Sequence, residues 1–82
     1  MNKYFIIEYI NKLTKNDYYK YLKKNNISIE EKDLDFLFNY IKKNKERILD
    51  NPITHLNYLK TVLPNNTYKT LEQLYYKYQT YL

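Results

Sequence analysis

The widest band of apolar positions in the chain lies in residues 28–44. Its large apolar side chains are Leu34, Phe36, Leu37, Phe38, Tyr40 and Ile41. At about 100° per residue they cover roughly 200° of a helix circumference, which is more than a surface helix needs. A helix with so wide an apolar surface requires neighbours on two sides. The pattern therefore predicts a central helix at about residues 29–43.

Four other segments repeat their apolar residues at helical spacing and predict helices that bury one face each. In residues 3–13 the apolar face is Phe5, Ile6, Tyr9, Ile10 and Leu13. In residues 15–25 it is Tyr18, Tyr21 and Leu22. In residues 52–63 it is Ile53, Leu56, Leu59 and Leu63, and in the last segment it is Leu71, Leu74, Tyr75, Tyr78 and Leu82.

Two patterns of capping residues predict where helices begin. Thr14 offers a hydroxyl to the first turn of the second helix, with Asp17 three residues further on to reach back. Ser28 and Glu31 have the spacing of a capping box, which predicts the start of the central helix at Ser28. Between these helices, Asn25-Asn26 suits the left-handed residue that ends a helix when no glycine is present.

The pattern loosens after Lys43, and residues 44–50 predict a short extra turn that places Ile48 and Leu49 against the core. Asn51-Pro52 then restarts a helix, because proline is tolerated at the first helical position. No alternating apolar and polar run is long enough for a strand. We therefore predict one all-α domain over residues 1–82, orthogonal or bundle-like, with four main helices plus this extra turn.

Composition excludes several classes of function. The chain has 82 residues, no cysteine and no glycine. Disulfide frameworks and thiolate metal sites are thus excluded. Phosphate-cradling loops, EF-hand calcium loops and KH clamp loops are excluded as well, because each needs glycine where the backbone approaches a ligand closely or takes positive φ. No export signal or membrane span is recognisable, so we expect a cytoplasmic protein.

The formal charge of +5, from 14 Lys+Arg against 9 Asp+Glu, raises the question of nucleic acid. A/T-rich codon usage offers another explanation, because Lys, Asn, Tyr and Ile have A/T-rich codons and the chain has one arginine. The lysines group at two helix ends. The candidate nucleic-acid residues are Lys20, Lys23 and Lys24, then Lys42, Lys43, Lys45 and Arg47. A hairpin of the two helices would separate these groups, whereas a sharper crossing would merge them into one phosphate-binding surface.

Twelve tyrosines are too many for so small a core. Tyr19, Tyr58 and Tyr76 fall off or beside the predicted apolar faces. Exposed tyrosines can anchor a protein interface, since the ring offers large contact area at low entropic cost. The alternative is codon bias combined with half-buried rings whose hydroxyls contact water.

Residues with catalytic or metal-binding chemistry are few. His55 is the only histidine, and we expect it to be a partly exposed surface residue. The acidic run from Glu30 to Asp35 suits the positive end of a helix, although Glu31 and Asp35 would share a face if they bound a divalent cation. We expect no catalytic residues, no metal site, no cofactor and no small-molecule substrate.

Several stretches together resemble a small bacterial family. They are Ile10-Asn11-Lys12-Leu13-Thr14, residues 18–26, Ile27-Ser28-Ile29, Ile48-Leu49-Asp50-Asn51 and residues 59–67. The chain is similar here to domain of unknown function 2624 of low-GC Gram-positive bacteria, although tyrosine often stands where the family would have Leu, Ala or Phe. The resemblance implies a helical fold and a bacterial cytoplasmic location, and it implies no activity or functional residues.

Taken together, these observations predict a non-catalytic helical protein that binds a protein partner or itself through a Tyr-rich helical face. The alternative is a sequence-independent nucleic-acid-binding accessory protein that uses the grouped lysines. We expect no interaction with a membrane.

Overall fold

A computed structural model describes residues 3–78 of the chain. These residues form five α-helices: α1 (Lys3–Lys12), α2 (Lys15–Lys24), α3 (Glu31–Asp50), α4 (Pro52–Val62) and α5 (Asn65–Tyr78). The all-α prediction is confirmed for this part of the chain. The predicted extension of the last helix to Leu82 lies outside the described residues.

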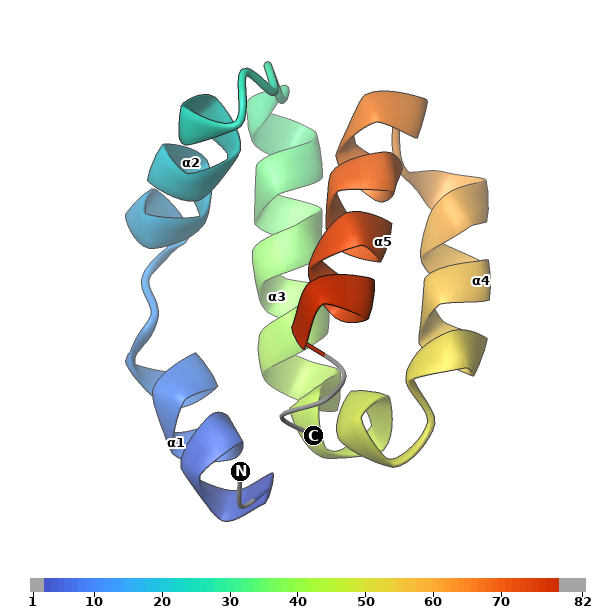
Figure 1. The fold of residues 1–82 in the computed structure, drawn as a ribbon. Helices are drawn as coiled ribbons and strands as arrows, with labels where there is room; N and C mark the ends of the chain where they lie inside the picture. Colours follow the sequence, from blue (N-terminus) through green and yellow to red (C-terminus); the bar gives the residue numbers. More distant parts are fainter. Residues whose placement is uncertain (1–2, 79–82) are drawn as a thin grey trace.

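The helices run up and down along one direction (Figure 1). α1 and α2 follow each other along one side of α3 and contact its lower and upper parts, respectively. α4 packs on α3 from the other side, and α5 packs on α4. The arrangement is therefore a bundle in which α3 is central, as the sequence predicted, and α1 and α2 together take the place of one long helix.

The break between α1 and α2 is explained by local chemistry. The Asp17 N–H donates to Thr14 Oγ1 at 3.2 Å, and the Thr14 N–H donates to Asp17 Oδ2 at 2.8 Å. This reciprocal capping box confirms the helix start predicted at Thr14. Because the backbone N–H bonds hold the carboxylate in its charged form, the pKa of Asp17 is lowered.

The end of α2 also follows the prediction. Asn26 takes a positive φ of 59°, the left-handed conformation expected at this position. The Ile27 N–H donates to the Leu22 carbonyl at 2.9 Å and the Asn26 N–H donates to the Lys23 carbonyl at 3.0 Å. This pair of bonds is a Schellman motif, so asparagine performs here the role that glycine usually has.

Both ends of the predicted central helix were wrong. α3 begins at Glu31 with Glu30 as N-cap and without a side-chain capping bond, so the capping box at Ser28 does not form. At the other end, α3 continues to Asp50. The segment 44–50 contains neither proline nor glycine, and half-buried Ile48 and Leu49 extend the apolar face of α3. The predicted extra turn is therefore the last part of α3. The described residues contain five helices, one for each segment with helical spacing, so the predicted count of four main helices plus a turn was wrong.

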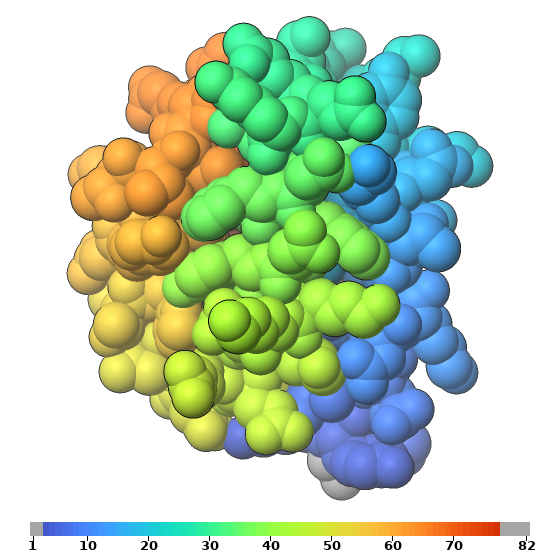
Figure 2. Space-filling view, turned by 180° about the vertical axis from the view of Figure 1, so that it is seen from behind, coloured from blue at the N-terminus to red at the C-terminus, as the bar shows by residue number. Residues whose placement is uncertain are grey.

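The core lies where α3, α4 and α5 meet. Its buried cluster is Leu37, Leu59, Leu63 and Tyr68, with Tyr18, Phe36, Tyr40, Ile41, Leu56 and Leu71 packed around it. Leu37 is the most deeply buried of these, with 1% of its surface exposed. Seen from behind, α3 runs down the middle of the molecule between α4 and the α1–α2 side (Figure 2).

Three predicted apolar faces need correction. In α2, Tyr21 is exposed although Leu22 is buried. In α1 the half-buried residues are Ile6, Ile7 and Ile10, whereas Phe5 and Tyr9 are exposed. The helix is turned so that branched aliphatic side chains contact α3 and the aromatic rings face solvent. In α4, Ile53 is exposed although Leu59 is buried.

Candidate functional site

The two lysine groups do not meet. Lys20, Lys23 and Lys24 lie in the second half of α2, which leads into the start of α3, whereas the group from Lys42 to Arg47 lies in the second half of α3. Of the two arrangements that the sequence allowed, α2 and α3 form the hairpin and not the sharper crossing. The two lysine groups therefore occupy opposite ends of α3 (Figure 1). The lysines therefore do not form the single continuous basic surface that is needed to follow a phosphate backbone.

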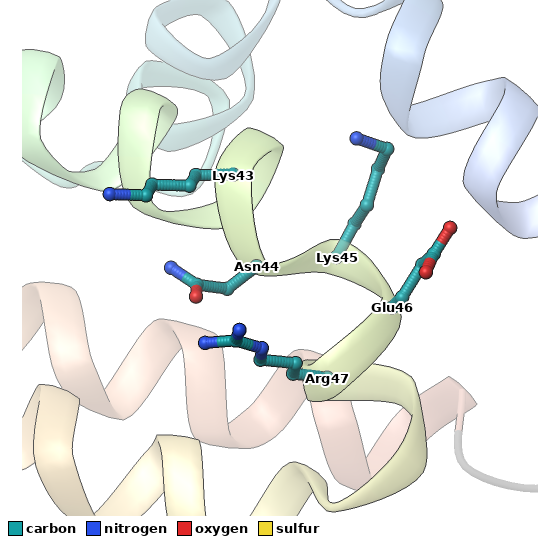
Figure 3. A pocket seen from close by; sticks show the side chains of 5 residues that line it. All are labelled: Lys43, Asn44, Lys45, Glu46 and Arg47. Carbon is teal, nitrogen blue, oxygen red and sulfur yellow. The ribbon is translucent and has the colours of Figure 1, made fainter.

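A shallow depression lies on residues 43–47 of α3. It has a volume of about 370 Å³ and is lined by Lys43, Asn44, Lys45, Glu46 and Arg47. Lys43, Asn44 and Arg47 extend to one side of the helix, whereas Lys45 and Glu46 extend to the other (Figure 3). These side chains do not converge on a common point, so the depression is a gap between surface side chains.

The acidic run at the start of α3 is engaged in ion pairs. The Lys15 ammonium lies 2.7 Å from Asp35 Oδ1 and 3.8 Å from Glu31 Oε1. The Asp35 carboxylate raises the pKa of Lys15, first through the hydrogen bond and then through its charge. The two carboxylates considered for a cation are therefore bridged by a lysine of α2. Among residues 3–78, no group of three or more His, Asp or Glu side chains could hold a metal ion.

His55 is more than a surface residue. Its Nδ1 lies 2.5 Å from the Tyr40 hydroxyl, and the two rings meet edge to face at 5.8 Å. The Tyr40 hydroxyl donates to Nδ1 in the tautomer whose ring proton is on Nε2, and it accepts in the tautomer whose proton is on Nδ1. Tyr40 is also stacked between Phe36 at 5.7 Å and Tyr58 at 5.5 Å. Burial, and secondarily Tyr58, raises the pKa of Tyr40.

Sequence reasoning missed this aromatic cluster of Phe36, Tyr40, His55 and Tyr58. Helical spacing places Phe36 beside Tyr40, but it cannot bring His55 to Tyr40, because that contact depends on how α4 is positioned along α3. The cluster holds α3 and α4 together through one hydrogen bond and two ring contacts, those of Tyr40 with His55 and with Tyr58. These rings form a packing contact between α3 and α4.

The three tyrosines predicted for an interface are all exposed, between 42% and 55% of their surface. They lie on three different helices and already have partners within the chain. Tyr19 is under the Lys23 ammonium, Tyr58 is stacked on Tyr40, and Tyr76 contacts Tyr75. Nothing in these contacts joins the three into one face.

Among the described side chains, the most exposed large aromatic ones lie on α1 instead. Tyr4, Phe5 and Tyr9 are exposed over 64%, 65% and 64% of their surfaces, and α1 has no buried residue. With the exposed Glu8 and Lys12 they form one strip at spacings i, i+1, i+4, i+5 and i+8, which we call the α1 face. Sequence reasoning missed this face because it assigned Phe5 and Tyr9 to the core.

α1 is nevertheless held on the bundle. The Lys3 ammonium forms an ion pair with Asp50 at the end of α3, and Ile6, Ile7 and Ile10 are half-buried. The rings of Tyr4 and Phe5 meet edge to face at 6.3 Å. The α1 face is thus an ordered aromatic surface on a fixed helix. Tyrosine and phenylalanine on such a surface are typical of protein interfaces.

Comparisons with protein-family models, with curated proteins and with solved structures found no match to this chain. The resemblance to domain of unknown function 2624 stays a prediction. Within residues 3–78, none of the helices combines the length and the apolar character needed to cross a membrane.

Proposed function

We propose that this chain is a non-catalytic protein-interaction module that docks its partner on the α1 face. The observation that carries the proposal is the orientation of α1, which turns isoleucines inward and leaves Tyr4, Phe5 and Tyr9 in solvent. Burying such rings against a partner releases about 25 cal/mol per Å² of apolar surface, which is the main driving force for association.

The roles of the other reactive side chains support a non-catalytic function. His55 is bonded to Tyr40, and Lys15 bridges Glu31 and Asp35. These groups join helices to one another, and such contacts leave them little freedom to take part in a reaction. The binding surface then resides on α1, a helix with no fully buried residue.

Site-specific photocrosslinking tests the proposal. We expect p-benzoylphenylalanine in place of Phe5 to give a discrete protein adduct in cells that express the chain. The same group in place of Tyr76 on α5 is the matched control, because Tyr76 is exposed to a similar degree. Adducts at both positions, or at neither, would contradict docking on the α1 face.

A further inference from the structure

Building on the proposed function, we infer that the partner of the α1 face is a second copy of this chain. The two copies pair through the same face, with their α1 helices antiparallel about a two-fold axis near Glu8 and Tyr9. Such an interface is isologous, so each contact occurs twice.

The distribution of charge is the first reason to expect a second copy as the partner. Every copy carries a formal +5, so two copies repel each other overall. The α1 face is balanced, with one carboxylate at Glu8 and one ammonium at Lys12. The third charged residue of α1, Lys3, already pairs with Asp50 of its own chain. A second copy can therefore approach along this strip without bringing uncompensated cations together.

The order of residues along the strip is the second argument. In an antiparallel pair centred between Glu8 and Tyr9, Phe5 of one copy faces Lys12 of the other, and Glu8 faces Tyr9. An ammonium then covers an aromatic ring, and a carboxylate accepts from a phenol hydroxyl. The chain already makes the first kind of contact twice, with Lys23 over Tyr19 at 5.9 Å and Lys42 over Phe38 at 5.4 Å. A parallel pair would instead place each charge opposite itself.

The size of the α1 face sets the expected affinity of the dimer. α1 has 10 residues, and at 1.5 Å per residue it is only about 15 Å long. Such a strip is smaller than the roughly 800 Å² per partner of a stable interface. The dimer should therefore be weak and reversible, with Kd between about 10 µM and about 1 mM.

Sedimentation equilibrium of the full chain tests the inference at low salt, from about 10 µM to a few times 1 mM. We expect a reversible monomer–dimer equilibrium that Phe5→Ala weakens about ten-fold or more, whereas Tyr76→Ala leaves it unchanged. Glu8→Lys should weaken it similarly, because the face becomes basic. Glu46→Lys is the matched control, since it makes the same charge change at an exposed position of α3.

The double variant Glu8→Lys/Lys12→Glu provides the decisive measurement. It restores the net charge of the face but places a carboxylate at position 12 opposite the Phe5 ring, whose negative face repels it. In the antiparallel pair the dimer should therefore stay as weak as with Glu8→Lys alone, and a return to full strength would contradict the antiparallel register. A monomer throughout the concentration range, or a dimer that these variants leave unchanged, would overturn the inference.

The crosslinking experiment separates this inference from the proposed function. If the crosslinker at position 5 gives an adduct with twice the mass of the chain, both the self-association and the proposed function are supported. An adduct of another mass, with the chain monomeric in solution, overturns the self-association and leaves the interaction module in place. If no adduct forms and no dimer is detected, both the self-association and the proposed function are overturned.

Discussion

The hydrogen bond between Tyr40 and His55 is the main polar contact between α3 and α4. Both side chains are half-buried, so each would lose a partner without being fully rehydrated if the other were removed. The stacking of Tyr40 on Phe36 and Tyr58 keeps the hydroxyl directed at His55.

Tyr40→Phe should therefore destabilise the protein by about 0.5–1.5 kcal/mol, because it keeps the stacked ring and removes only the hydroxyl. Urea denaturation followed by circular dichroism measures the loss. Tyr58→Phe is the matched control, since Tyr58 belongs to the same stack and is more exposed. Equal effects of the two substitutions would show that the hydroxyl bond contributes nothing.

The raised pKa of Tyr18 predicts that the free energy of unfolding falls at alkaline pH. Burial raises its pKa from 10.0 to about 12, so between these values the folded chain keeps a proton that the unfolded chain has lost. The corresponding stability is complete below pH 10 and is lost as the pH rises through about 12. Tyr18 is partly exposed, so the loss should be about 1–2 kcal/mol. Tyr18→Phe should flatten the decline in urea-measured stability over this range, and an unchanged decline would contradict the assignment.

At the scale of elements, short-range capping chemistry decides where α2 begins, whereas it does not decide where α3 begins. Thr14 and Asp17 bond reciprocally, but Ser28 and Glu31, which have the same spacing, do not. The start of α3 is set by backbone bonds from Asp33 and Leu34 to the Glu30 carbonyl. Ion pairs of Lys15 with Glu31 and Asp35 add a tertiary contact at that end.

Thr14→Ala and Ser28→Ala form a matched pair that tests this difference. The first substitution should cost about 1 kcal/mol of stability, because it removes the oxygen that accepts from the Asp17 N–H. The second should change stability by less than about 0.5 kcal/mol, since Ser28 is exposed and lies outside α3. Thermal unfolding measures both, and equal losses would contradict the capping assignments.

At the scale of the whole molecule, the stability of the fold depends on a small buried core. Among the residues that the structure describes, the buried apolar side chains are Leu22, Leu34, Leu37, Leu59, Leu63 and Tyr68. For a domain of 82 residues, total stability should be about 4–12 kcal/mol. A single cavity at the centre of this core is therefore a large fraction of the total.

Leu37→Ala should cost about 3–5 kcal/mol, because Leu37 is the most completely buried apolar side chain. Phe5→Ala should change monomer stability by no more than about 0.5 kcal/mol, since that ring faces solvent. Urea denaturation at low protein concentration measures both. A large loss for Phe5→Ala would place its ring in the core and remove the basis for the α1 face.

The sequence was a reliable guide wherever the deciding interactions are local. The capping box at Thr14, the left-handed Asn26 and the helix start at Pro52 depend on residues within one turn of one another. It was a poor guide to the rotation of α1, because Ile6 and Ile10 have large apolar neighbours on both sides, Phe5 and Tyr9 on one and Ile7 on the other, so the pattern fits either orientation. The candidate surface was missed for that same reason.

By itself the sequence determined that this chain is helical, that its helices break near residues 14, 26 and 51, and that the segment around Leu37 is central. Hydrophobic periodicity and capping residues act over a few positions, so they can be recognised without coordinates. Only the tertiary structure decided that α3 continues to Asp50, that Tyr40 meets His55, and that α1 turns its aromatic side outward. Those outcomes depend on competition between faces of similar hydrophobicity, which is resolved only when neighbouring helices pack.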